Sequence, residues 1–163
     1  MKIKQSEISR SDIMRSVKSK DTKPEMAVRR LVYRLGYRFR LHRKSLPGTP
    51  DLVLPRLKKI VFVHGCFWHG HTCARGDRIP KNNHDYWVTK IERNRERDQL
   101  NQALLSAQGW RIYIVWECQI KSLKLEEDLK AFLESPNTSD PDSQTCDASA
   151  RSAIRAGIPS TIG

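Results

Sequence analysis

Apolar residues recur along the chain at two spacings, which predict alternating helices and strands. Helical spacing, with an apolar residue every three or four positions, marks residues 21–36, 84–108 and 123–133. Short apolar or alternating runs predict strands at residues 37–41, 51–54, 59–64 and 111–117. Elements in this order favour an α/β fold, in which helices flank a small mixed sheet.

The helix predicted over residues 21–36 has the clearest end signals. Asp21 or Thr22 can cap its N-terminus, Pro24 suits the first turn, and Gly36 ends it. We expect one domain over residues 21–134. A basic arm over residues 1–20 precedes it, with Met14 on an apolar helical face, and residues 135–163 have the polar composition that is typical of a disordered tail.

The positive charge of the chain lies mainly near its start. The 163 residues include 30 Lys and Arg against 18 Asp and Glu, and residues 1–44 alone hold 14 Lys and Arg against 4 Asp and Glu. Basic segments attract polyanions because each neutralised phosphate releases a condensed counterion. Nucleic acid is therefore the leading partner, although an ordinary soluble or ribosome-associated basic protein has a similar composition.

The apolar runs exclude some cellular locations. The longest of them, residues 60–63 and 112–116, are far too short to span a bilayer, which rules out an integral membrane protein. Charged residues interrupt the start before a signal-peptide core can form, so we expect a cytoplasmic protein. In that reducing compartment, metal binding or burial of the four cysteines is favoured over disulfide formation.

Three potential metal ligands lie within eight residues. Cys66, His71 and Cys73 are close in sequence, and Cys118 directly follows the strand predicted over residues 111–117. Three thiolates and an imidazole favour zinc, and four protein ligands leave no open position, so the site would be structural. The alternative is that Cys66 and Cys118 are buried thiols and His71 is exposed. Cys146, in the polar tail, is expected to be a free thiol.

Two carboxylates and two histidines are candidate catalytic residues. His64 and His69 flank the cysteine cluster and are not needed by a closed metal site. Asp51 opens an apolar strand, where a carboxylate can hold Mg²⁺ beside a phosphate, although a Pro-Asp pair can also simply form a turn. Glu25 can complement the dipole of its helix or can orient a histidine that acts as a general base.

Four segments carry a family resemblance, in the order PGTPDLVL, FVHGCFWHGHTC, NRERD and GWRIYIVWEC. They closely resemble the very-short-patch mismatch-repair endonucleases of bacteria, over about residues 8 to 120. The resemblance implies a restriction-endonuclease-like α/β core. It also implies Mg²⁺-dependent hydrolysis that nicks DNA 5′ to the thymine of a T:G mismatch, as arises when 5-methylcytosine is deaminated.

The resemblance also implies roles for the candidate catalytic residues. Asp51 and the backbone carbonyl of Val63 would bind Mg²⁺, and some relatives have threonine in place of Val63. His69 would activate water with Glu25 as its hydrogen-bonding partner, and His64 would join the metal and phosphate network. The chain departs from the common nuclease signature, because its strand lacks the Glu-x-Lys half.

Aromatic and basic residues are the expected DNA contacts. Phe67 and Trp68 resemble the aromatic wedge of the family, which enters the duplex beside the mismatch where unstacking costs least. Met14 resembles a second wedge, and packing inside the protein is the alternative in both cases. The expected phosphate contacts are Arg15, Lys18 and Lys20.

Two polar residues interrupt an apolar stripe of the helix predicted over residues 84–108. Asn94 and Asp98 share this stripe with Trp87 and Ile91. The resemblance suggests that they belong to the surroundings of the active site, and an internal hydrogen bond is equally compatible.

The expected partner is double-stranded DNA with a T:G mismatch. No membrane association is expected. Mismatch-repair proteins and a cytosine-5 DNA methyltransferase system are the expected protein partners, with the enzyme associated with the nucleoid when bound. A monomer is expected because one mismatch offers no two-fold axis. The alternatives are a restriction-type enzyme that cuts both strands and a zinc-braced protein that binds distorted DNA without cutting.

Overall fold

The computed structural model describes residues 20–136 of the chain, and residues 1–19 and 137–163 lie outside the described part. The predicted helical arm, with Met14, Arg15 and Lys18, is therefore outside it, as is almost all of the predicted tail.

Four strands form one mixed sheet in the order β1-β2-β3-β4. They are β1 (Arg40–Leu41), β2 (Leu52–Leu54), β3 (Lys59–His64) and β4 (Arg111–Trp116). β2 is antiparallel to β1 and β3, whereas β3 and β4 are parallel, with His64 paired to Trp116. The parallel strands β3 and β4 therefore end side by side.

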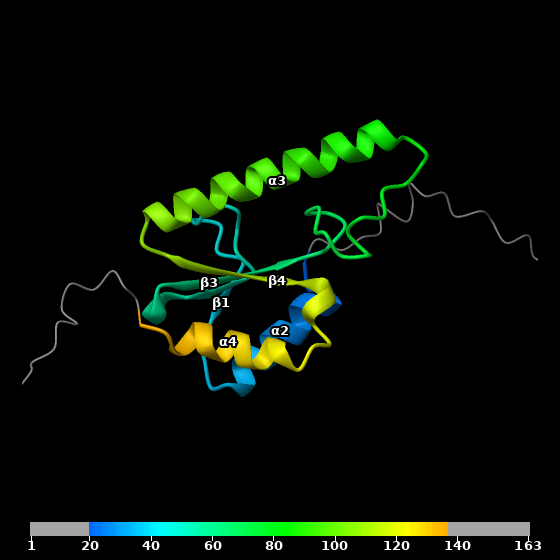
Figure 1. Ribbon diagram of the computed structural model, residues 1–163. Helices are drawn as coiled ribbons and strands as arrows, with labels where there is room; N and C mark the ends of the chain where they lie inside the picture. Colours follow the sequence, from blue (N-terminus) through cyan, green and yellow to red (C-terminus); the bar gives the residue numbers. More distant parts are fainter. Residues whose placement is uncertain (1–19, 137–163) are drawn as a thin grey trace, which may run out of the picture.

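Three helices cover the two faces of this sheet. The long helix α3 (His84–Ala107) connects β3 to β4 on one face, and α2 (Lys23–Arg34) and α4 (Lys124–Glu134) lie on the other (Figure 1). Two single 3₁₀ turns, η1 (Pro55–Leu57) and η2 (Glu117–Gln119), follow β2 and β4. The predicted α/β architecture is confirmed. No helix within residues 20–136 combines the length and the apolar character that a membrane span requires.

Alternation along the strands separates the core into two apolar clusters. Successive side chains of a strand point to opposite faces. Leu52, Leu54 and Val61 accordingly pack with α2 and α4. Val53, Ile60 and Phe62 belong to a second cluster, with Leu105 of α3 and Trp110. The sheet is thus held rigidly between its helices, and the candidate catalytic residues lie at its edge.

The strand predicted over residues 37–41 is mostly absent. Only Arg40–Leu41 pairs with β2, and both residues are exposed. Tyr37 and Phe39 pack instead against the cluster under α2 and α4. The alternation at these positions reflects this packing, and sheet pairing involves only the end of the segment.

A buried lysine ties the start of β3 to the end of α4. Lys59 Nζ donates hydrogen bonds to the backbone oxygens of Leu133, at 2.8 Å, and Ser135, at 2.6 Å. Burial lowers the pKa of Lys59. These bonds satisfy carbonyl groups that the end of a helix otherwise leaves without partners.

Candidate active site

An open cleft of about 1020 Å³ lies beside the start of β2 and the end of β3. All four residues predicted to be catalytic line it, namely Glu25, Asp51, His64 and His69. α2 supplies the first of them, the start of β2 the second, and β3 with its following loop the two histidines. Lys20 and Trp68 also line this cleft, together with Asp98 of α3.

Asp51 is fixed to the neighbouring strand by its backbone. Its Oδ2 accepts a hydrogen bond from the Val63 N–H at 2.8 Å. Burial raises the pKa of Asp51 to about 6. The Val63 hydrogen bond lowers this pKa, and the nearby Glu25 carboxylate raises it further. A carboxylate and a backbone carbonyl are hard oxygen donors, so Asp51 and Val63 suit a small divalent cation.

The buried charge of Asp51 affects the expected stability of the protein when no Mg²⁺ is bound at Asp51. The carboxyl group titrates at 3.8 when unfolded and at about 6 when folded, so its contribution to stability is complete below pH 3.8 and is lost as the pH rises through 6. At pH 8, we expect Asp51→Asn to raise the free energy of unfolding by about 2–3 kcal/mol. Urea denaturation at pH 8 and pH 5 measures the effect, which should fall to about half at the lower pH.

Asp98→Asn is the matched control for that prediction. The pKa of Asp98 is lowered in the folded protein, so this substitution should destabilise the protein at pH 8. No stabilisation by Asp51→Asn would contradict the assigned sign for Asp51, and stabilisation by both substitutions would show that the effect is not specific to the buried Asp51 carboxylate.

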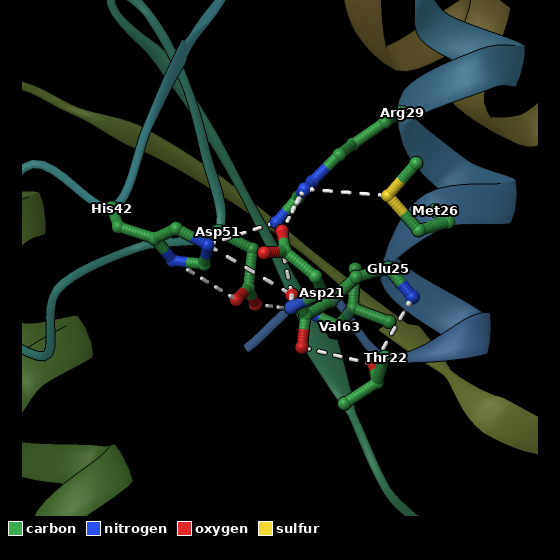
Figure 2. Close-up of polar contacts among 8 residues, drawn as sticks. All are labelled: Asp21, Thr22, Glu25, Met26, Arg29, His42, Asp51 and Val63. Carbon is green, nitrogen blue, oxygen red and sulfur yellow. Dashed lines mark hydrogen bonds and ion pairs between the residues drawn. The ribbon is translucent and has the colours of Figure 1, made fainter. Parts of the chain in front are cut away.

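Glu25 lies in a network of hydrogen bonds at the start of α2 (Figure 2). Arg29 Nη2 donates to Glu25 Oε2 at 3.0 Å, and the Asp21 N–H donates to the same oxygen at 2.9 Å. Thr22 Oγ1 donates to Glu25 Oε1 at 2.9 Å. Arg29 also pairs with Asp21 through Nη1. Both oxygens of this buried carboxylate thus have partners on its own helix or helix cap.

His69 contacts a different carboxylate from the one expected. Its Nδ1 pairs with Asp98 Oδ2, which corrects the prediction that Glu25 is its hydrogen-bonding partner. The sequence could not distinguish the two, because Asp98 reaches His69 from α3 across the loop. A carboxylate on Nδ1 places the ring proton there, which leaves Nε2 with a lone pair that can accept a proton.

His64 lies flat against His69. The ring centroids are 3.9 Å apart and the planes differ by 11°. Burial, with a further contribution from His69, lowers the pKa of His64 to about 4. Burial raises the pKa of Asp98, but its hydrogen bond with His69 and the nearby positive charges lower it overall. At neutral pH, His64 is therefore uncharged and Asp98 is ionised.

The four predicted metal ligands form one cluster beside the cleft. The ligand atoms of Cys66, His71, Cys73 and Cys118 all lie within 4.8 Å of one another. Because β3 and β4 are parallel and in register, Cys66 and Cys118 lie just beyond the paired residues His64 and Trp116. Cys118 Sγ is 3.6 Å from His71 Nδ1, close to the ligand separation of roughly 3.5–3.8 Å in a tetrahedral zinc site.

Two thiols of this cluster, those of Cys66 and Cys73, differ in acidity. Hydrogen bonding to His71, aided by the Gly76 N–H, lowers the pKa of Cys73 to about 6. Burial raises the pKa of the Cys66 thiol to about 12. The cluster could hold a metal ion, which would bind both sulfurs as thiolates.

Two glycines let the loop after β3 close tightly around this cluster. Gly70 has φ +61°, and a Cβ there would lie 2.8 Å from Ile91 Cγ2 of α3. A Cβ on Gly76 would lie 1.8 Å from the carbonyl oxygen of His71. Any larger residue at either position would force the loop away from its ligands.

Phe67 and Trp68 form an aromatic cluster with two residues at the start of α3. Both rings pack edge to face with Trp87, which also contacts Tyr86. Phe67 and Trp68 are half-buried, and neither belongs to the two apolar clusters of the described core. Lys90 Nζ lies 5.5 Å above the Trp68 ring.

Asn94 has a structural partner in this loop. Its Nδ2 donates to the Trp68 carbonyl oxygen at 2.9 Å. Asn94 therefore makes an internal hydrogen bond, whereas Asp98, the next polar residue of its stripe, contacts His69. The stripe predicted on α3 thus holds the aromatic loop and the histidine together.

Sequence reasoning missed Arg29 and His42. Arg29 lies four residues after Glu25 on a helix, a spacing that favours an ion pair and that could have identified it. His42 has no comparable signal, because only the fold brings it to within 3.9 Å of both Glu25 and Asp51.

Comparison with known proteins adds independent information. The family model described as DNA mismatch endonuclease Vsr matches residues 4–75. The chain is 54% identical over 123 residues to the type II nicking enzyme V.XorIIP of Xanthomonas oryzae, covering 75% of this chain and 90% of that protein. It is 46% identical over 113 residues to V.NmeAIP of Neisseria meningitidis, covering 69% and 80%. It is 39% identical over 113 residues to DNA mismatch endonuclease Vsr of Escherichia coli, covering 69% and 72%.

Proposed function

Because this chain belongs to the Vsr family of DNA mismatch endonucleases, we propose that it nicks one DNA strand 5′ to the thymine of a T:G mismatch. Such mismatches arise when 5-methylcytosine is deaminated, so the nick would begin very short patch repair. The observation that carries the proposal is the cleft in which Asp51, His64 and the His69–Asp98 pair converge.

His69 is the residue that we propose as the general base. Its Nε2 would accept the proton of the attacking water, while Asp98 holds the ring through Nδ1 and stabilises the charge that develops on it. His64 packs against the same ring as an uncharged neighbour in the phosphate network. Glu25 would hold the cleft wall through Arg29 and the helix cap rather than contact His69.

Asp51 and the Val63 carbonyl are the proposed Mg²⁺ ligands. The hydrogen bond between Asp51 and the Val63 N–H supports this assignment, because it fixes the two groups side by side. A bound Mg²⁺ would supply Lewis-acid stabilisation of the charge on the scissile phosphate.

The Cys66, His71, Cys73 and Cys118 cluster is the proposed structural zinc site. Its ligand set and the closeness of its donor atoms support zinc. We also propose a restriction-endonuclease-like core for the domain over residues 21–134. The mixed sheet, with α3 crossing between its parallel strands, is consistent with it.

Phe67 and Trp68 are the proposed wedge beside the mismatch. Their half-buried cluster borders the cleft, which supports contact with a base step. Met14 would act from the opposite groove, and phosphate contacts would come from Arg15, Lys18 and Lys20, the last of which lines the cleft.

The cellular setting is proposed from the same family membership. The enzyme would act as a cytoplasmic monomer that associates with the nucleoid when bound to DNA. Its protein partners would be mismatch-repair proteins and a cytosine-5 DNA methyltransferase system that sets the sequence context.

The proposal is tested with a duplex that carries one T:G mismatch and a separate label on each strand. With Mg²⁺ present, the protein is expected to nick only the strand that contains the mismatched thymine. Addition of a chelator should stop the reaction, and the T:A counterpart of the duplex is the control.

Two other results would point to the alternative functions. Cutting of both strands of the paired duplex would indicate a restriction enzyme. Tight binding of the mismatched duplex without cleavage, across several flanking sequences, would favour a protein that recognises distortion without cutting.

A further inference from the structure

Two residues that the proposed reaction does not use lie between Glu25 and Asp51. Figure 2 shows the Arg29 guanidinium reaching from α2 toward His42, with the Asp51 carboxylate also beside the imidazole ring. Arg29 and His42 are largely buried, with side chains 9% and 17% exposed. Arg29 Nη2 lies 2.8 Å from His42 Nε2 and 3.0 Å from Glu25 Oε2.

The chemistry of arginine fixes the direction of the contact with His42. A guanidinium group has only N–H donors and no acceptor. His42 Nε2 must therefore accept the hydrogen bond, because a proton on that nitrogen would set two donors against each other. The ring proton of His42 consequently lies on Nδ1.

Nδ1 of His42 lies near the second oxygen of Asp51. His42 Nδ1 is 3.9 Å from Asp51 Oδ1, whereas Asp51 Oδ2 is held by the Val63 N–H. The distance is too long for a direct hydrogen bond and is compatible with electrostatic orientation or a bridging water. Asp51 Oδ2 thus has a direct N–H partner, and Oδ1 lies near His42 Nδ1.

The same cluster also argues against a second metal ion. The ligand atoms of Asp21, Glu25 and His42 lie within 4.8 Å of one another, as metal ligands do. However, Arg29 contacts all three, through Nη1 to Asp21 and through Nη2 to the other two. The guanidinium group occupies the position where a cation would bind.

We propose that Arg29 and His42 are positioning residues, in which Arg29 fixes the Nδ1–H tautomer of His42 and His42 orients the Asp51 carboxylate toward a divalent cation. This inference rests on the proposed role of Asp51 as the cation ligand. Partners in the outer shell of metal sites commonly act in this way, by holding a ligand in its binding orientation.

The tautomer is tested directly by NMR. Two-bond ¹H–¹⁵N correlation spectra of the ¹⁵N-labelled full chain distinguish Nδ1–H from Nε2–H histidine, and the cross-peaks of His42 are those missing from His42→Gln. We expect Nδ1–H in the wild type and a shift toward Nε2–H in Arg29→Met. Arg34→Met is the matched control, because Arg34 lies on the same helix but is exposed and pairs with Glu126.

The effect on Asp51 is tested with Mn²⁺, whose free concentration is followed by EPR during titration of the protein without DNA. Asp51→Asn gives the background binding. Arg29→Met and His42→Phe are expected to weaken the Asp51-dependent binding by about tenfold or more. His42→Gln should retain most of it, because an amide can accept from Arg29 and donate toward Asp51.

The outcomes separate this inference from the proposed function, since neither measurement depends on nicking. An Nε2–H tautomer in the wild type would overturn the inference even in an active nickase, and observing it requires only that His42→Gln folds well enough to assign the spectrum. Equal Mn²⁺ binding by the wild type and His42→Phe would also overturn it. A shifted tautomer with weakened Mn²⁺ binding would support it even if no mismatch were nicked.

Discussion

Replacing His69 with alanine is expected to slow nicking of a T:G duplex by about 10²- to 10⁴-fold, the usual contribution of a general base. The loss follows because Nε2 is the proton acceptor that the Asp98 contact leaves free. Binding of the mismatched duplex should change little. Single-turnover nicking and gel-shift titration measure the two effects separately.

Two further variants make this result specific to His69. Asp98→Asn keeps the shape of the side chain that contacts His69, but its amide can also stabilise the tautomer of His69 that carries the proton on Nε2. We therefore expect a smaller loss of nicking rate than in His69→Ala, with unchanged DNA binding. His84→Ala alters an exposed histidine and should leave nicking unchanged. If His69→Ala cut at the wild-type rate, the assignment of the base would be wrong. If it lost DNA binding and nicking in parallel, His69 would be a substrate-binding residue.

Loss of the metal cluster is expected to have the largest effect on stability. Binding of a structural zinc ion contributes about 10–16 kcal/mol in zinc-finger peptides, whereas a whole domain is stable by only about 5–15 kcal/mol. Cys73→Ser should therefore remove the cooperative thermal transition seen by circular dichroism. A chelator should have the same effect on the wild type and should release one zinc ion per chain.

Cys146→Ser is the matched control for that experiment, because Cys146 is the fourth cysteine of the sequence and lies outside the ligand set. It should unfold like the wild type. An unchanged transition in Cys73→Ser, together with a purified protein that contains no zinc, would remove the structural role proposed for the cluster.

The sequence predicted best those elements whose pattern is local. The strand predicted over residues 59–64 matches β3. Its centre, residues 60–63, is an uninterrupted apolar run, which suits a strand that is buried on both faces. The three candidate metal ligands that are close in sequence were equally visible. Even Cys118 could be placed with them, because it follows a strand that proved to be the parallel neighbour of β3.

The sequence did not predict pairings that depend on the approach of distant elements. Glu25 was the expected partner of His69, and only the position of α3 over the loop brings Asp98 to that ring instead. Tyr37 and Phe39 alternate as a strand would, yet they pack against the core beneath α2 and α4. His42 had no signal at all, because its role depends on contacts from α2 and from the segment before β2.

The anchoring of α4 by Lys59 has a practical consequence for tethered derivatives. Lys59 and His64 are at opposite ends of β3, and the described chain leaves α4 beside Lys59 through Ser135. At about 3.3 Å per residue, the strand separates these ends by roughly 16 Å. A fluorophore or a DNA-targeting module fused directly after Pro136 would therefore start on the side away from the cleft. The length of its linker would determine how far the module reaches along a bound duplex.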